Sequence, residues 1–441
     1  MPSPRNLQYS GPEPSSISEE TIHIPKGPKR QVESEEAFSG LGNRALERPE
    51  VKISQDREKP RDVPPSGIRP QPIPSSTATV AQKRGKKPTE IYERLGQVGE
   101  GTYGRVFKAK NTETGELVAL KQIRTATEKD GYPITTMREM RLLQRLHHPN
   151  IVGLKEIMLQ APYIYLVFEY MDHDLTGLNG NPAYRLDLTH VKCLIQQLLR
   201  GLGHMHDVGI LHRDLKGSNL LIDRDGLLKI ADFGLARLDE ATGGPGLRRD
   251  YTNRVITLWY RPPELLLGST DYGAEVDIWS AGCILLELLT GKAPFQASDE
   301  IGQLQSIWST LGTPRIGEEE SGDVGRMRWD GVMDLPWWQL LRPNTPRSCR
   351  LTELYSEHLT PAGLDFVKGM LSLDPKDRLS ASSLLNHPWL QKEAPFPSDS
   401  SSIPGIEGDW HEFEMKQLRK QQHQHHIAHG GGERPHRSKP G

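Results

Sequence analysis

His212-Arg213-Asp214-Leu215-Lys216-Gly217-Ser218-Asn219 is the stretch that decides the fold of this 441-residue chain. It fits the pattern H-R-D-x-x-x-x-N, and Asp232-Phe233-Gly234 follows at a distance that suits the same arrangement. Both segments are highly specific. Their order along the chain indicates an active site built around two carboxylates, those of Asp214 and Asp232.

A glycine-rich segment stands upstream, Gly99-Glu100-Gly101-Thr102-Tyr103-Gly104-Arg105-Val106, with the pattern G-x-G-x-x-G-x-V. Alone it is weak evidence, because a Rossmann turn and an ordinary glycine-rich hairpin look similar. A Rossmann turn leads into a helix, whereas residues 105–110 continue as a strand pattern. Glycines between two strands let backbone N–H groups approach phosphate oxygens without interference from Cβ atoms.

The segment Val118-Ala119-Leu120-Lys121 lies on the third predicted strand, from which an ammonium can reach the α- and β-phosphates of a nucleotide. A lone lysine on a strand is normally a surface charge. Glu139, on the helix predicted next, is the candidate partner that would hold Lys121 in place.

The periodicity predicts an α+β fold with a small β-rich lobe and a larger helical lobe. Residues 91–98, 105–110, 117–122 and 164–168 favour strands, the first three as an antiparallel meander. Apolar residues at helical spacing follow from Val191 to Met205, and more helices are predicted near 277–290, 299–311 and 362–371. We expect one two-lobed domain over 89–393, with lobes of about 89–168 and 172–393.

Composition argues against several functions. The chain has 55 Lys and Arg against 57 Asp and Glu, so no global field favours nucleic acids or membranes. Cys193, Cys283 and Cys349 are far apart, which favours thiols in a reducing compartment over disulfides or a zinc site. No apolar run reaches the ~18 residues of a membrane span, so we expect a soluble intracellular protein.

Both ends of the chain differ from the centre. Residues 1–88 are rich in Pro, Ser, Glu and Lys and are predicted to be disordered. They contain the basic cluster 83–87, either a nuclear import signal or a solvated linker end. Residues 394–441 form a C-terminal extension, predicted to be partly helical near 409–420 and to end in a solvated tail rich in His, Gln and Gly.

Over residues 91–390 the sequence resembles the protein kinase family, and within it the cyclin-dependent kinases. Pro133-Ile134-Thr135-Thr136-Met137-Arg138-Glu139 is similar to the helix with which that group contacts its cyclin. Thr136 and Met137 replace the usual serine and isoleucine variants, so the sequence does not identify the cyclin. The resemblance implies a bilobal fold, ATP and Mg²⁺ as cofactors, and a cyclin as regulatory subunit.

The resemblance also implies a role for each matching residue. Asp214 would accept the proton of the substrate hydroxyl, Lys216 would neutralise charge on the γ-phosphate, and Lys121, held by Glu139, would contact the other phosphates. Asn219 and Asp232 would hold Mg²⁺. The residues implied to bind ATP are Val98, Gly99, Glu100, Gly101, Thr102, Tyr103, Gly104, Arg105, Val106, Ala119, Lys121, Glu169 and Met171.

Residues 251–261 are similar to the activation segment of the family, which makes Thr252 the activating phosphorylation site. An ordinary loop threonine is the alternative. Guanidinium groups fit phosphate oxygens, and the arginines implied to surround this phosphate are Arg138, Arg213 and Arg237. At the glycine loop, Thr102 and Tyr103 occupy positions where some relatives carry inhibitory phosphates. The proline pocket of the family matches Val255, Ile256 and Arg261, which implies Ser or Thr followed by Pro as substrate.

Residues 170–178 and 251–264 resemble the transcription-elongation branch, whose members act in the nucleus on the C-terminal repeat domain of RNA polymerase II. Asp409-Trp410-His411-Glu412-Phe413, followed by Lys416, Arg419 and Lys420, is similar to the extension of the CTD kinase I subfamily. In that subfamily the extension packs toward the hinge and the bound nucleotide. The alternative is a tail pinned to the surface by Trp410 and Phe413.

Two rival functions stay open. A non-catalytic scaffold that binds a cyclin is disfavoured by the intact set Lys121, Asp214, Asn219 and Asp232. A proline-directed kinase without a role in transcription, such as the mitogen-activated type, would show T-x-Y in the activation loop. Here Thr252 is followed by Asn253-Arg254.

Overall fold

The computed structural model describes residues 88–101, 104–124, 134–181, 184–239, 249–317, 325–403, 408–417 and 420. All of them belong to one compact unit, Thr77–Gly441. The predictions for residues 1–87, for the basic cluster and for the His-rich end of the tail lie outside the described residues. Among the described helices, none has the length and apolar character needed to cross a membrane.

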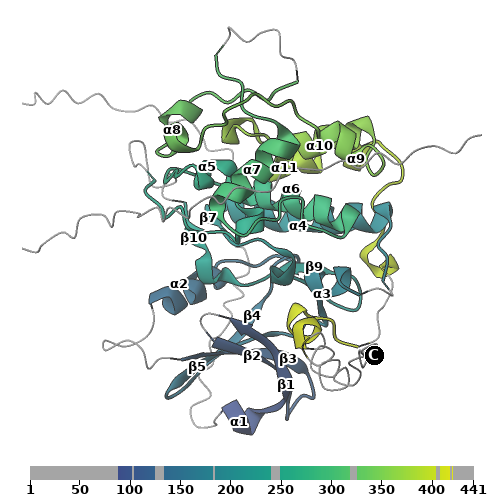
Figure 1. Cartoon of the computed structure of the whole chain (residues 1–441). Helices are drawn as coiled ribbons and strands as arrows, with labels where there is room; N and C mark the ends of the chain where they lie inside the picture. The colour runs from purple at the N-terminus through teal and green to yellow at the C-terminus, as the bar shows by residue number, and fades with distance from the viewer. Residues whose placement is uncertain are drawn as a thin grey trace, which may run out of the picture. The chain divides into compact units, whose positions relative to one another are not determined.

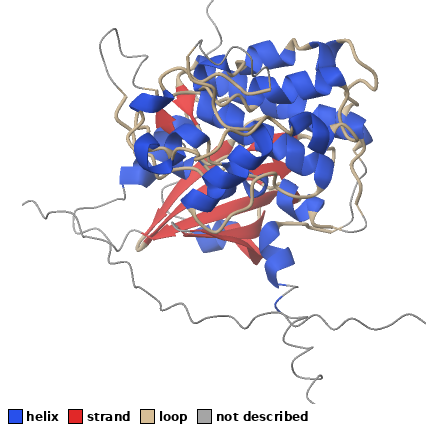
Figure 2. Ribbon diagram, turned by 45° about the horizontal axis from the view of Figure 1, so that its top comes forward, coloured by secondary structure: helices blue, strands red, loops and turns tan. Residues whose placement is uncertain are grey.

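The N-terminal lobe is a five-stranded antiparallel sheet with the order β1-β2-β3-β5-β4 (Figures 1 and 2). Its core contains alternate residues of the strands, which point to one face of the sheet, among them Ala109, Val118 and Leu120. The predicted meander is therefore confirmed. The bounds are β1 Tyr92–Gly101, β2 Gly104–Asn111, β3 Leu117–Arg124, β4 Leu154–Gln160 and β5 Tyr163–Glu169, with helices α1 Pro88–Ile91 and α2 Ile134–Leu143.

The C-terminal lobe is helical. The longest helix is α4, Leu188–Asp207, whose first turn is capped by the Asp187 carboxylate, which accepts a hydrogen bond from the His190 N–H. Its apolar stripe from Val191 to Met205 is buried, as the periodicity predicts. The other helices are α3 Leu175–Asn179, α5 Pro263–Leu266, α6 Glu275–Thr290, α7 Glu300–Leu311, α8 Trp338–Leu341, α9 Leu351–Tyr355, α10 Pro361–Met370, α11 Ala381–Leu385 and α12 Pro388–Gln391.

Short strands between the lobes position the two loops that contain residues 212–219 and Asp232 (Figure 1). One sheet has the order β6-β8-β9, and β7 pairs with β10. Residues 212–219 run from β7 to β8, and Asp232 stands two residues after the end of β9, so the pairing of β8 with β9 brings both segments together. The bounds are β6 His173–Asp174, β7 Ile210–Leu211, β8 Leu220–Ile222, β9 Leu228–Ile230 and β10 Arg237–Leu238, with the 3₁₀ turns η1 Gly217–Asn219, η2 Phe233–Leu235 and η4 Leu258–Tyr260.

The C-terminal extension returns to the region that joins the lobes. After the 3₁₀ turn η7, Ser400–Ser402, the described chain resumes at residue 408, and Trp410 forms a parallel bridge with His173 of β6. Residues 412–417 are helical, within the range expected from the sequence. Figure 1 shows this yellow segment beside α3 and the N-terminal sheet.

Candidate active site

A chain of ion pairs joins the two lobes at Lys121. Its ammonium lies 2.7 Å from Glu139 Oε1 on α2 and 2.9 Å from Asp232 Oδ1. Burial disfavours the charge on Lys121, but the fields of Asp232 and Glu139 outweigh burial and raise its pKa. Lys121 in turn lowers the pKa of Asp232 to about 2. The predicted contact between Lys121 and Glu139 is present. Helix α2 therefore lies close enough to β3 for the Glu139 carboxylate to reach the Lys121 ammonium.

The glycine-rich segment forms the hairpin between β1 and β2. Val106 pairs directly with Lys121 across β2 and β3, and Ala119 stands two residues before Lys121, so the three share one face of the sheet. Val98 and Gly99 are half-buried, whereas Glu100 and Arg105 are exposed and lie 3.4 Å apart as an ion pair. Thr102 and Tyr103, with the inhibitory sites predicted there, lie outside the described residues.

No side chain fits at Gly104. A Cβ atom there would overlap the main-chain oxygen of Gln122 on β3. The close packing of β2 against β3 therefore requires a glycine at the last position of the motif. The first two glycines, Gly99 and Gly101, lie on the end of β1, the part of the sheet opposite Val106 and Gly104.

The Asp214 carboxylate is held by three neighbours. Its Oδ2 accepts from the Lys216 ammonium at 2.9 Å and from the Asn219 amide at 3.2 Å, and its Oδ1 accepts from the Thr257 hydroxyl at 2.8 Å. The Lys216 ammonium also lies 3.3 Å from the Thr257 hydroxyl. The carboxylate is thus fixed in orientation and lies beside a cation.

The backbone of this loop depends on Asp277 of α6. The fully buried Asp277 carboxylate accepts hydrogen bonds from the N–H groups of His212 and Arg213, each at 2.9 Å. Burial opposes its ionisation, but hydrogen bonds, the strongest from His206, lower its pKa. Arg213 has φ 65, a left-handed conformation that needs such support in a residue with a side chain.

His212 is fixed in one tautomer. Its Nδ1 accepts from the Asp214 N–H at 3.2 Å, and its Nε2 lies 3.0 Å from the carbonyl oxygen of Ala231, to which it donates. His212 therefore connects the loop with Asp214 to the residue that precedes Asp232.

Two oxygen donors remain open for a hard cation. The Asn219 amide nitrogen donates to the Asp214 carbonyl oxygen at 2.7 Å, which leaves the amide oxygen free. The Asp232 side chain is 49% exposed, and only its Oδ1 contacts Lys121. One carboxylate and one amide oxygen fit Mg²⁺, which usually takes few protein ligands and completes its shell with phosphates and water. Groups of three or more His, Cys, Asp or Glu that could hold a metal are absent from the described residues.

The activation segment gathers two of the three predicted arginines. The guanidinium carbons of Arg213 and Arg237 lie 5.7 and 5.1 Å from the ring centre of Tyr251. Tyr251 directly precedes the exposed Thr252, whose carbonyl accepts from Tyr272 at 2.8 Å. Arg138 is exposed on α2. Arg213 and Arg237 thus both lie against the residue that precedes Thr252.

Sequence reasoning missed Thr257 and Asp277. Thr257 lies in the segment matched to the activation loop, but its contact with Asp214 joins residues 43 positions apart. Asp277 opens a helix and reads as an ordinary acidic residue in a first turn. The contact between Asp277 and His212 spans 65 positions, and no local pattern indicates it.

Glu169 and Met171, the two hinge residues predicted to bind ATP, have different surroundings. Met171 is buried, while the Glu169 carboxylate pairs with the Lys229 ammonium at 2.8 Å and accepts from the Gly153 N–H at 2.9 Å. The Glu169 side chain therefore connects strands β5 and β9. Any contact of Glu169 with ATP would come from its main chain.

The C-terminal extension meets the hinge at Tyr170 and at Asp172 to Asp174. The Asp174 N–H donates to the Trp410 carbonyl at 3.0 Å, and the Glu412 N–H donates to Asp174 Oδ2 at 2.7 Å. His411 packs edge-on against Tyr170, with ring centres 6.1 Å apart. The expected return to the hinge is present, but the main chain makes most of the contacts, whereas the sequence suggested the aromatic pair.

The N-terminal lobe also contacts the extension. The Lys108 ammonium of β2 forms an ion pair with the Asp409 carboxylate and lies 4.4 Å from the ring centre of Tyr170. Burial opposes ionisation of Asp409, but Lys108 lowers its pKa. The extension thus links β2 to β6. In the basic run of the extension, the Lys416 ammonium pairs with the Glu412 carboxylate at 2.7 Å.

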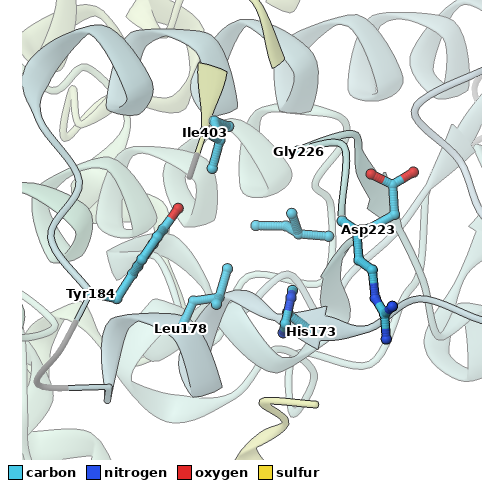
Figure 3. Close-up of a pocket in the computed structure, with 8 residues that line it drawn as sticks. His173, Leu178, Tyr184, Asp223, Gly226 and Ile403 are labelled. Carbon is cyan, nitrogen blue, oxygen red and sulfur yellow. The ribbon is translucent and has the colours of Figure 1, made fainter. Parts of the chain in front are cut away.

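A small cavity lies under this attachment (Figure 3). It has a volume of about 10 Å³ and is lined by His173, Tyr184 and Ile403, among others. His173 Nε2 and the Tyr184 hydroxyl are buried without a hydrogen-bond partner in the described part of the chain. His173 Nδ1 accepts from the Trp410 N–H at 3.3 Å.

Residues 92–390 match the protein kinase domain. The chain belongs to the protein kinase family. Its bilobal α+β fold confirms the predicted class, and the likeness to a solved kinase is clear: a chain of the yeast RNA Pol II CTD kinase CTDK-1 complex matches with a TM-score of 0.63 and 42% identity, over 73% of this chain and 98% of that one.

Several relatives of this kinase confirm the predicted subfamily. It is 49% identical over 329 residues to the CTD kinase subunit alpha of Schizosaccharomyces pombe, which covers 75% of this chain and 53% of that protein. It is 40% identical over 405 residues to the protein of that name from Saccharomyces cerevisiae, with 90% and 71% covered. Cyclin-dependent kinase C-2 of Oryza sativa is 45% identical over 349 residues, with 75% and 65% covered. The chain thus spans about half to two thirds of the length of most of these relatives.

Proposed function

We propose that this chain is the catalytic subunit of a cyclin-dependent serine/threonine kinase, which transfers the γ-phosphoryl group of Mg·ATP to Ser or Thr followed by Pro. The observation that carries the proposal is the arrangement around Asp214, whose carboxylate contacts Lys216 at 2.9 Å and Thr257 at 2.8 Å. The ion-pair chain Glu139–Lys121–Asp232 stands beside it with both contacts below 3 Å.

Each group has a defined task in this reaction. Asp214 accepts the proton of the substrate hydroxyl, and Lys216 offsets the negative charge that collects near Asp214. Lys121 orients the α- and β-phosphates and is kept in place by Glu139. Asp232 and Asn219 hold Mg²⁺, and the bound Mg·ATP supplies the phosphoryl group and its leaving group.

Selection for proline follows from the backbone at Ile256. This residue has φ 66, and its carbonyl oxygen accepts from Arg261 Nε at 3.2 Å and from the terminal guanidinium nitrogen at 3.1 Å. The carbonyl is therefore unavailable to a substrate N–H at the next position. Proline has no N–H to leave unsatisfied, so it binds there without the desolvation cost that other residues carry.

A cyclin is the proposed partner, and α2 is its proposed contact. Met137 is 38% exposed on α2, two residues before the buried Glu139. A partner that covers Met137 would stabilise the position of α2 in which Glu139 meets Lys121. The matching solved structure is that of a CTD kinase complex, and other relatives are named cyclin-dependent kinases.

The proposed substrate is the C-terminal repeat domain of RNA polymerase II, in the nucleus. The names of the relatives CTD kinase subunit alpha support this choice. A role outside transcription for a proline-directed kinase is the remaining candidate, and no contact in the structure favours it.

Copurification of the chain from its own cells, followed by assays of the complex, tests the proposal. We expect a cyclin in the complex and phosphorylation of repeat-domain peptides at Ser-Pro, with a preference of about tenfold or more over matched Ser-Ala peptides. Equal rates on both peptides would contradict the proline preference. A complex without kinase activity on any Ser or Thr peptide would overturn the function.

A further inference from the structure

The described part of the chain contains three Thr-Pro dipeptides, at Thr313, Thr345 and Thr360. Two of them are built into the fold. Thr313 is fully buried, and its hydroxyl accepts from the Arg347 N–H at 3.1 Å. Thr360 caps α10 by accepting from the Gly363 N–H at 3.1 Å, and its hydroxyl donates to Glu393. Neither hydroxyl can enter another active site without local unfolding.

Thr345 differs from both. It lies between α8 and α9 in a segment with no helix or strand, and residues 344–348 are all exposed. Pro343 and Pro346 flank the pair Asn344-Thr345 and favour extended backbone. Within the described chain, neither the Thr345 hydroxyl nor its main chain has a hydrogen-bond partner. Thr345 itself could therefore enter a cleft without breaking a hydrogen bond of its own.

Three basic residues lie close to Thr345 in the sequence. Arg342, Arg347 and Arg350 are all exposed and stand within five residues of Thr345. The Arg347 guanidinium donates to the Ser309 hydroxyl of α7 at 2.9 Å, and the Arg350 guanidinium pairs with the Glu353 carboxylate at 2.6 Å. A phosphate adds a charge of about −1.5 to −2 and accepts hydrogen bonds from guanidinium groups. The arginines next to Thr345 in the sequence would thus offset part of the charge of a phosphate there.

The segment cannot reach its own active site. The Arg342 N–H donates to the Trp338 carbonyl at 2.8 Å. The Arg347 N–H donates to the Thr313 hydroxyl at 3.1 Å, and the Arg347 carbonyl accepts from the Thr313 N–H at 2.9 Å, so both ends are fixed to the helical lobe. Figure 1 shows α8, which precedes the segment, far from β7 and β9. A second kinase molecule has to supply the catalytic groups.

We propose that Thr345 is an autophosphorylation site modified in trans by a second copy of this kinase, an inference that rests on the proposed function. In ATP the bond between the γ-phosphorus and the β,γ-bridging oxygen breaks, and a bond forms between that phosphorus and Thr345 Oγ1. The hydroxyl proton passes to Asp214 of the acting copy, and ADP leaves with the bridging oxygen. No further reactant is needed.

The test uses the purified complex of the full chain with its cyclin. Wild-type complex and Mg·ATP are mixed with a complex that carries Asp214→Asn, so that the second is substrate only. Mass spectrometry then measures phosphate at Thr313, Thr345 and Thr360. We expect Thr345 to be modified about tenfold or more faster than the other two, at a rate that rises with wild-type concentration.

Two variants sharpen the result. Pro346→Ala should slow modification of Thr345 about tenfold or more, because it restores an N–H at the position that selects proline. Thr345→Ala should leave the rate on a Ser-Pro peptide unchanged and remove the phosphate. If the peptide is phosphorylated and Thr345 is not, the inference is wrong. If the peptide is not phosphorylated either, the proposed function itself fails.

Discussion

The main chain of Trp410 passes so close to Gly177 that a Cβ atom on residue 177 would overlap the Trp410 carbonyl. The same carbonyl accepts from the Asp174 N–H at 3.0 Å. Gly177 belongs to the first turn of α3, where its N–H donates to the Asp174 carboxylate at 2.7 Å. The glycine therefore leaves room for the C-terminal extension beside the hinge.

Gly177→Ala should displace the extension without disturbing the catalytic groups. We expect faster hydrogen exchange at the Asp174 and Glu412 amides and a several-fold higher KM for ATP, because the hinge loses the packing of His411 on Tyr170. The matched control is Gly203→Ala on α4, where a new Cβ would lie 3.7 Å from the Ala381 Cβ, an ordinary contact. Unchanged exchange at both amides would show that the close approach does not hold the extension.

Deletion of residues 405–441 should weaken ATP affinity or activity several-fold and leave the fold and cyclin binding intact. The ion pair between Lys108 and Asp409 contributes to this contact, and salt screens charges. The loss should therefore be larger at low salt than at high salt. Unchanged KM for ATP and unchanged kcat at both salt concentrations would show that the extension does not serve the active site.

Lys121→Met should reduce kcat/KM by about a hundredfold or more, because the phosphates lose an oriented cation. The variant should also raise the pKa of Asp232 from about 2 toward its ordinary value, since Lys121 is the main cause of the depression. In the wild type this lowered pKa stabilises the fold above the unfolded pKa, and the contribution is lost as the pH falls toward 2. Carbon NMR titration of Asp232 measures the shift.

The control for this variant is Lys155→Met. Lys155 pairs with Glu116 at 2.7 Å on the surface of the N-terminal lobe, so this variant removes an equal charge and a similar contact. It should change neither activity nor the Asp232 titration. Equal losses in the two variants would attribute the effect to general charge.

Asp214→Asn should lower kcat by about 10² to 10⁴ while ATP binding changes little, because this carboxylate acts on the substrate hydroxyl and not on the nucleotide. Single-turnover kinetics and a nucleotide-binding assay separate the two effects. Asp207→Asn, at the exposed end of α4, is the control. Near-normal turnover in Asp214→Asn would refute the assignment of the base.

Arg378→Met should lower the free energy of unfolding by about 3–5 kcal/mol, because it leaves the Glu264 carboxylate buried without its partner. The two guanidinium nitrogens of Arg378 each lie 2.7 Å from an oxygen of Glu264, and burial raises the pKa of Glu264 despite that pairing. Denaturant unfolding measures the loss. The double variant with Glu264→Gln should recover part of it, whereas additive losses would show that the two side chains do not interact.

The sequence predicted the parts of this protein that local pattern encodes. Alternation and glycine punctuation indicate the strands of the small lobe, and the apolar spacing from Val191 to Met205 indicates α4, because burial imposes the periods of strand and helix. The two loops that carry Asp214 and Asp232 are recognised from short motifs. The sequence also suggested the pair Lys121–Glu139, which the structure contains.

Only the tertiary structure decided which distant groups complete the site. Asp277 supports the backbone at His212, and Thr257 holds Asp214, through contacts between segments 43 to 65 residues apart. It also decided that the extension attaches through the main chain of Trp410, and that Thr345 is free where Thr313 is buried. A Thr-Pro dipeptide or a single acidic residue looks the same in the sequence whether it is buried or exposed. Their burial and partners depend on how the whole chain packs, which no short window of sequence contains.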